Sequence, residues 1–292
     1  MVTRARGTFF GALAIAAWSV YGVLLAAERE TGPFLSMAIV FSFAVATLLL
    51  WRLARGEGLR GLLPMPLPTL ALGFIGLFGS NILYVVSLSL GGEPVAVNIA
   101  ALSWPVFMAL FIAVFGVARP GWLDGLAMAV GFAGVVLLVT RGRSLAVDWA
   151  VLPALLGAVC WAALSALRTR VPPGPRDAML HFAALSCLVA WVLALTLEGL
   201  SLPPPGEFLR LAVVGMLTVG LANHLWDVAT RYGDPVLLAS MSFMEPVAST
   251  ALIALVLSQP VTWSDAGALL LVLAAVAASF MSERRRTSSS RR

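Results

Sequence analysis

The residues best suited to chemistry are a few polar side chains inside long apolar stretches, each about the length of a membrane-spanning helix. In the stretch 69–90, Asn81 and Tyr84 are three residues apart and share one face of a helix. A second polar stripe lies in the stretch 208–230 and contains Asn223, His224, Trp226 and Asp227. Amide, hydroxyl, imidazole and carboxylate groups at this spacing can hydrogen-bond the polar head of a small ligand.

A structural role for the same residues stays open at this point. Asn81 and Asn223 could bond to neighbouring helices, because polar groups inside a bilayer seek partners there. Asp227 could pair with Arg231, which follows four residues later on the same helix face. The spacing alone favours neither role.

Two pairs of prolines recur at matched spacing. Pro94 and Pro105 are 11 residues apart, and so are Pro235 and Pro246. The first proline of each pair suits the start of a helix. The second lies inside the helix, where it removes a backbone hydrogen bond and predicts a kink. We therefore expect hinges at Pro105 and Pro246.

The residue before each interior proline differs between the two pairs. It is Trp104 in the first and Glu245 in the second. Packing explains a tryptophan at a kink, whereas a carboxylate inside an apolar span is costly and marks a functional position. We expect Glu245 to contact a ligand or to carry a proton.

Tryptophans also lie in the middle of apolar stretches. Trp18 and Trp161 are mid-stretch, although tryptophan concentrates at the ends of membrane helices, and Tyr21 follows Trp18 by one turn. The other aromatic candidates are Tyr84, Trp104 and Trp226. An aromatic cavity built from these rings suits flat apolar substrates or organic cations, through stacking and cation–π contact. Core packing is the alternative explanation for buried tryptophans.

The composition places these residues in a membrane. The chain is 60% hydrophobic and 11% charged, against roughly 25% charged in a typical soluble domain. We therefore expect a polytopic membrane protein. The first apolar run is too long for a signal peptide and lacks a convincing cleavage site, so we expect it to be retained as a span.

Several other classes of site are not expected. Cys160 and Cys187 lie in apolar segments, which predicts neither a disulfide nor a metal site. The two histidines, His181 and His224, are on different helices, and no catalytic cluster accompanies them. The pI of about 10.2 comes from loops and tails, so nucleic acid is not an expected partner. No cofactor, metal or catalytic residue is predicted.

Breaks at charged, glycine and proline clusters predict ten transmembrane helices and no inserted soluble domain. The predicted helices are 8–27, 34–52, 69–90, 94–116, 120–140, 149–169, 178–197, 208–230, 235–258 and 264–282. The predicted fold is thus an all-α integral membrane protein.

The second half of the chain repeats the first. Trp122-Leu-Asp124 returns as Trp263-Ser-Asp265, about 141 residues later, as do the two prolines. Each half holds five helices, and an odd number makes the second half begin on the opposite side of the membrane. We expect two inverted five-helix repeats around a central cavity. Their bounds are 1–142 and 143–282, followed by a basic, disordered cytoplasmic tail at 283–292.

The fifth and tenth helices are rich in small residues and have almost no polar groups at mid-span. Small faces allow close approach of helices, so we expect these two to form a structural pair away from the substrate. Asp124 and Asp265 near their starts are expected to cap them.

Arginine counting predicts the orientation. If the N-terminus is inside, only Arg29, Arg141, Arg143 and Arg210 fall on the outer side. Both termini are therefore expected in the cytoplasm. The arginine pair Arg141 and Arg143, which is followed by Asp148, departs from this pattern.

These patterns resemble a known group of transporters. Glu245-Pro246-Val and Pro260-x-x-Trp263-x-Asp265-x-x-Gly are similar to motifs of EamA-type members of the drug/metabolite transporter superfamily. Among these, the chain resembles the YddG-type bacterial aromatic amino-acid exporters. The resemblance implies a bacterial inner-membrane location and a central cavity lined by the first four helices of each half.

The expected function is export of aromatic amino acids and similar small amphiphiles by alternating access. Trp18, Trp104 and Trp161 would stack on the substrate, while Asn81, Tyr84 and His224 would bond its head and Glu245 would orient its amine or carry a proton. Export of drugs, quaternary amines or other metabolites is an alternative, and a membrane enzyme or lipid-handling protein is a distant one. The expected partners are a small-molecule substrate and lipid, with a monomeric chain.

Overall fold

The computed structural model describes residues 2–20, 24, 30–58, 62, 65–144, 149–175, 177–256 and 262–289. Within these ranges the secondary structure is helical and contains no strand. Nine helical stretches in the described part are long and apolar enough to cross a bilayer. The first predicted span is described as α1, Arg4–Ser19, and its predicted continuation falls mostly outside the described residues.

The elements follow one another with short connections. Up to residue 144 they are α1 (Arg4–Ser19), α3 (Pro33–Ala54), α4 (Leu67–Phe74), η2 (Ile75–Gly79), α5 (Ser80–Ser89), α6 (Pro94–Ala101), α7 (Trp104–Val114) and α8 (Trp122–Thr140). After it they are η3 (Trp149–Val151), α9 (Leu152–Leu167), α10 (Ala178–Leu193), η4 (Ala194–Glu198), α11 (Pro205–Val213), η5 (Val214–Ala222), α12 (Asn223–Tyr232), α13 (Pro235–Met241), α14 (Met244–Val256) and α15 (Trp263–Ser289).

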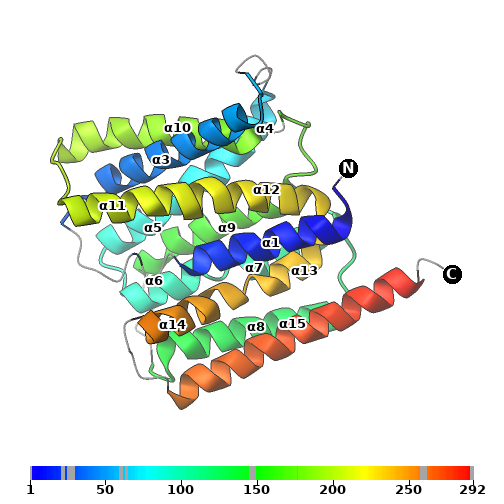
Figure 1. Cartoon of the computed structure of the whole chain (residues 1–292). Coiled ribbons are helices and arrows are strands. Elements are labelled where there is room, and N and C mark those ends of the chain that lie inside the picture. The colour runs from blue at the N-terminus through cyan, green and yellow to red at the C-terminus, as the bar shows by residue number, and fades with distance from the viewer. Residues whose placement is uncertain are drawn as a thin grey trace.

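The helices run roughly side by side, and both ends of the chain lie at the same end of the bundle (Figure 1). We call this the termini end and the other the mouth end. Helix α3 begins at the mouth end with Pro33 and finishes at the termini end with Ala54. One expectation is wrong here: the tail 283–292 is not disordered throughout, because α15 continues as a helix to Ser289.

Two membrane helices are broken at the positions that the prolines predicted. The first break separates α6 from α7 at Leu102 and Ser103, and the second separates α13 from α14 at Ser242 and Phe243. Pro105 and Pro246 follow these breaks, since proline lacks the N–H that would continue the helical ladder. Three-residue turns fill the gaps, such as the bond from the Glu245 amide to the Ser242 carbonyl at 3.2 Å.

Wider turns interrupt two other membrane helices, a feature that the sequence did not predict. The segments η2 and η5 are π-helical, and they lie between α4 and α5 and between α11 and α12. The Asn81 side chain donates to the Leu77 carbonyl at 2.7 Å, which satisfies a backbone group of the first wide turn. Such turns are rare and are often found at functional sites.

The α8 and α15 helices lie side by side at one edge of the bundle (Figure 1). A Cβ added at Gly134 would lie 2.9 Å from the Val272 side chain, so the small residue allows the close approach. Asp124 accepts from the Gly121 amide at 2.7 Å, and Asp265 accepts from the Thr262 amide at 2.7 Å. The predictions of a structural pair and of capping aspartates are both confirmed.

Candidate functional site

A cavity of about 720 Å³ lies in the middle of the bundle. Its wall includes the exposed helix-end residues Pro33 and Ser89 and reaches inward to Trp104, which is buried. Because α3 begins and α5 finishes at the mouth end, the cavity opens there and ends inside the bundle. Its polar and acidic lining residues are Ser36, Ser80, Asn81, Tyr84, Ser89, Asn98, Thr218, Asn223 and Glu245.

Four tryptophans from four helices meet at the inner end of the cavity. Trp18, Trp104 and Trp161 line the cavity, and Trp226 lies behind them at 1% exposure. The ring centroids of Trp18 and Trp226 are 5.2 Å apart, and those of Trp18 and Trp161 are 5.9 Å apart. Tilted and edge-to-face contacts at this distance are favourable for aromatic rings. We call these four residues the tryptophan cluster.

The indole N–H groups fix the orientation of two rings in the cluster. Trp18 donates to the side-chain oxygen of Asn223 at 3.0 Å and to the Thr218 carbonyl at 3.1 Å. Trp226 donates to the Ser165 hydroxyl at 3.0 Å. The wide turn η5 supplies the Thr218 carbonyl, so this irregular backbone positions a cavity-lining ring.

Glu245 contributes a carboxylate to the cavity wall from the first turn of α14. The break before α14 turns the chain so that this residue lines the cavity beside α1. The Ser19 hydroxyl donates to the Glu245 main-chain carbonyl at 3.3 Å, but no described residue hydrogen-bonds or ion-pairs with its carboxylate. Within the described ranges, no three His, Cys, Asp or Glu side chains are grouped to hold a metal ion.

Two asparagines in the wall have hydrogen-bonding groups to offer. The Asn98 side chain, on α6, has no hydrogen-bond partner in the described part of the chain. The Asn223 oxygen accepts from Trp18, which leaves its NH₂ group to donate. The wall therefore combines flat apolar rings, one carboxylate and neutral amide donors.

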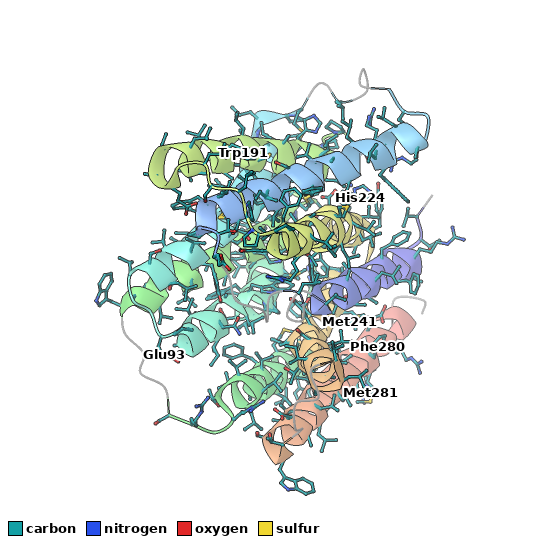
Figure 2. The ribbon with its side chains drawn as sticks, turned by 60° about the vertical axis from the view of Figure 1, so that its left-hand side comes forward. Glu93, Trp191, His224, Met241, Phe280 and Met281 are labelled. Carbon is teal, nitrogen blue, oxygen red and sulfur yellow. The ribbon has the colours of Figure 1, made fainter. Side chains whose placement is uncertain are left out.

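Beyond the tryptophan cluster, toward the termini end, buried ion pairs replace the cavity. Asp227 accepts from Arg168 at 2.8 Å and from Arg231 at 2.5 Å. The side chains of Arg168 and Asp227 are 2% and 1% exposed. The buried His224 interacts electrostatically with Asp227 and Asp177, and Figure 2 labels it toward the termini end.

Asp177 forms a second ion-pair centre at the termini end. It accepts from Arg52 at 2.6 Å and from Arg55 at 2.7 Å. Burial on its own would raise the pKa of Asp177, but the hydrogen bonds and charges of these arginines hold that pKa below its ordinary value. These contacts tie α10 to the end of α3.

The first helix seals the termini end against α12 and α13. A Cβ added at Gly7 would lie 2.5 Å from the Gly233 backbone nitrogen, so the two backbones are in direct contact. The Asp234 amide donates to the Thr8 hydroxyl at 3.0 Å, and Arg4 forms an ion pair with the Asp234 carboxylate.

The structure brings together most of the predicted site residues. Trp18, Asn81, Tyr84, Trp104, Trp161 and Glu245 line the cavity, and Trp226 contacts two of these rings. His224 and Asp227 lie outside the cavity lining. Tyr21 lies outside the described residues, and Pro105 and Pro246 follow the helix breaks.

Sequence reasoning missed Asn98, Thr218 and the small serines of the wall. A signal for Asn98 was present, because it is a lone amide inside an apolar span six residues before Trp104. Nothing in the sequence singled out Thr218, whose role depends on a wide turn that local patterns do not reveal.

Comparison with known proteins agrees with this architecture. Residues 148–281 match the EamA-like transporter family. The chain is 30% identical over 259 residues to an aromatic amino acid exporter, YddG, of Ancylobacter novellus, covering 86% of this chain and 89% of that protein. It is 24% identical to the aromatic amino acid exporter YddG of Salmonella typhimurium, over 90% of this chain and 92% of the relative.

A solved crystal structure has the same fold, with a TM-score of 0.86 and 26% identity over 96% of this chain and 99% of the other. The family and the relatives indicate a multi-pass membrane transporter rather than an enzyme. The chain therefore belongs to the EamA-like transporters of the drug/metabolite transporter superfamily and is YddG-like.

Proposed function

We propose that this transporter exports aromatic amino acids and similar small amphiphiles, and that the central cavity is the substrate site. The observation that carries the proposal is the wall itself, where three tryptophans meet a carboxylate and amide donors in one cavity of about 720 Å³. A cavity of this size accommodates a small aromatic molecule. The relatives named as aromatic amino acid exporters support the same substrate class.

The substrate pose follows from the chemistry of the wall. The aromatic side chain stacks among Trp18, Trp104 and Trp161, which offer ring faces and edges. Glu245 accepts hydrogen bonds from the substrate amine. The substrate carboxylate takes hydrogen bonds from the amides of Asn98 and Asn223, with Asn81 and Tyr84 completing the wall. His224 and Asp227 act at the closed termini end and do not touch the substrate in this state.

The transport mechanism is alternating access by two inverted repeats, 1–142 and 143–282. Three matched features support the repeat: the helix breaks before Pro105 and Pro246, the wide turns η2 and η5, and the capping carboxylates Asp124 and Asp265. Rocking of the halves about the two breaks closes the mouth and separates the ion pairs at the termini end.

Both termini lie in the cytoplasm in this proposal, so the cavity faces outward across the bacterial inner membrane. The distribution of arginine supports the orientation. Described arginines at the termini end include Arg4, Arg6, Arg52, Arg55, Arg119, Arg168, Arg170 and Arg231, whereas Arg141, Arg143 and Arg210 lie at the mouth end. We propose that the chain works as a monomer, since a single chain supplies the described cavity wall.

One observation favours a second substrate class. Glu245 is the only charged residue among the described lining residues, and an isolated carboxylate among aromatic rings also suits quaternary amines and other cationic drugs. Competition separates the two classes, since a drug exporter is inhibited by methyl viologen and little affected by phenylalanine.

The test is transport by purified protein in liposomes. We expect saturable uptake of radiolabelled tryptophan and phenylalanine, competition between the two, and little transport of leucine. Tryptophan should also raise the thermal unfolding temperature in detergent, because a ligand that binds only the folded state stabilises it. Transport of methyl viologen without transport of either aromatic amino acid would replace the proposal with the second class.

A further inference from the structure

The described cavity wall carries a negative charge and no positive charge. Glu245 is acidic, and no arginine or histidine is among the described lining residues. Its carboxylate has no hydrogen bond or ion pair with any described residue, whereas Asp177 and Asp227 each bind two arginines. The cavity therefore presents an acidic group that the rest of the described chain leaves uncompensated.

The backbone places the Glu245 carboxylate at the start of a helix. Glu245 lies in the first turn of α14, after the break at Ser242 and Phe243, where the positive end of the helix dipole lies. A partly buried charge is costly unless an opposite charge or hydrogen-bond donors satisfy it. No described residue provides such a partner for Glu245, whereas a protonated amine on the ligand would provide both the opposite charge and the donors.

The aromatic rings reinforce the preference for a cation. Trp18 and Trp104 line the same cavity as Glu245, with ring centroids 6.4 Å apart and planes at 86°. Tryptophan has the most favourable ring face for a cation. An ammonium group placed between these rings and the Glu245 carboxylate would interact favourably with both.

A substrate carboxylate has weaker partners in this cavity. Asn98 and Asn223 offer neutral amide N–H groups, and no cationic donor accompanies them. Hydrogen bonds in which both partners are charged are stronger than those from a neutral donor. The carboxylate of an amino acid is therefore tolerated, while its amine carries the recognition.

We propose, resting on the proposed function of the cavity, that the transporter recognises aromatic substrates by their protonated amine. Aromatic monoamines that lack a carboxylate are then substrates alongside the amino acids. Aromatic acids that lack an amine are excluded, since Glu245 repels them and no basic group in the described wall attracts them.

Proteoliposome uptake of radiolabelled tryptophan, with tryptamine and indole-3-propionate as competitors, tests this proposal. We expect tryptamine to inhibit at least as strongly as unlabelled tryptophan and indole-3-propionate to be at least tenfold weaker. Labelled tryptamine should itself be taken up. In Glu245→Gln the gap between the two competitors should disappear, because the amide has no charge.

Glu93→Gln is the matched control for a lost negative charge. Glu93 caps α6 through the Ala96 amide at 2.8 Å, is not part of the cavity lining, and is labelled in Figure 2 toward the mouth end. We expect it to keep the wild-type order of competitors. If Glu245→Gln fails to fold, the wild-type competition decides the question without it.

The outcomes separate this proposal from the one on which it rests. Tryptophan transport in which indole-3-propionate competes as well as tryptamine overturns the amine preference alone. A wild-type gap that persists in Glu245→Gln overturns the assignment to Glu245. Transport of tryptamine without tryptophan rejects export of amino acids but keeps recognition by the amine. Transport of neither compound rejects both.

Discussion

The central cavity and the closed termini end differ in how their polar groups are satisfied. In the cavity that opens at the mouth end, Glu245 and Asn98 have no protein partner among the described residues. At the termini end, the Asp177 and Asp227 carboxylates are 4% and 1% exposed, and each accepts from two arginines. The open end thus keeps its hydrogen-bonding capacity for a ligand, while the closed end uses it to hold helices together.

The tryptophan cluster separates the two ends. Trp18 faces the cavity on one side and packs against the fully buried Trp226 on the other. The same rings therefore close the inner end of the proposed substrate cavity and border the closed region. A substrate bound against Trp18 would therefore lie one ring away from the buried Trp226.

The largest expected effect comes from breaking the ion-pair centre at Asp227. Asp227→Ala leaves Arg168, whose side chain is 2% exposed, without its carboxylate partner. Loss of one partner of a buried pair costs about 3–5 kcal/mol. We expect a marked drop in thermal unfolding temperature in detergent and a weaker seal at the termini end.

The control removes both charges at once. The double variant Arg168→Met with Asp227→Leu removes the two most buried charges together and fills similar volume. Arg231, whose side chain is 15% exposed, keeps some access to solvent, so the double variant should regain most of the lost stability. If Asp227→Ala unfolded at the same temperature as the wild type, this pair would not be one of the contacts that hold the closed end together.

The next effect concerns the backbone contact between α1 and the loop before α13. Gly7→Ala places a Cβ 2.5 Å from the Gly233 nitrogen, and that backbone cannot simply rotate away. Overpacking of this kind costs about 1–3 kcal/mol. In a background with Cys160 and Cys187 replaced, a Thr230→Cys reporter, whose native residue is 8% exposed, should become more reactive toward alkylating reagents.

Gly125→Ala is the matched control for that substitution. An added Cβ there meets nothing within 4 Å, so the change should leave Thr230→Cys protected. It should slightly raise stability, by about 0.5–1 kcal/mol, because alanine favours the helix over glycine. Equal reactivity in both variants would show that the Gly7 contact does not hold the end closed.

A smaller effect is expected from removing one ring at the inner end of the cavity. Trp161→Ala removes a stacking surface that lines the cavity and is only half-buried. We expect the KM for tryptophan to rise about tenfold, equivalent to about 1.4 kcal/mol. Trp122→Ala, 76% exposed and outside the cavity, should keep the wild-type KM. An unchanged KM in Trp161→Ala would remove this ring from the site.

The last and smallest effect is a pH dependence of stability on the acid side, and it belongs to Asp177. The folded protein holds its pKa below that of the unfolded chain, because Arg52 and Arg55 stabilise the charged form despite burial. The stability that it contributes is complete above the unfolded pKa of about 4 and is lost as the pH falls through the lower folded value. Unfolding measured against pH should show this acid-side loss in wild type but not in Asp177→Asn.

The sequence predicted the parts of the site that depend on local rules. The spacing of Pro105 and Pro246 located both helix breaks, because a missing N–H interrupts a helix wherever it falls. The rarity of charges at mid-span singled out Glu245. The i,i+4 spacing also anticipated the pair between Asp227 and Arg231, which the structure contains.

Contacts between distant segments were beyond local patterns. Arg168 reaches Asp227 from 59 residues away, and Trp18 reaches Asn223 from 205 residues away. The wide turns η2 and η5 likewise depend on packing against neighbouring helices rather than on a residue signature. For these reasons the sequence identified a polar stripe on α12 without separating Asn223, which lines the cavity, from Asp227, which does not.

In the proposed mechanism, the cavity between the mouth end and the tryptophan cluster binds the substrate. Its most direct test is protection of a cysteine in the wall, Val85→Cys, in detergent-purified protein with the native cysteines replaced. Ser201→Cys, on the exposed connection before α11, is the reference position. We expect tryptophan to slow alkylation of Val85→Cys and to leave Ser201→Cys unaffected. Alkylation of Val85→Cys at the same rate with and without saturating tryptophan would contradict binding in this cavity.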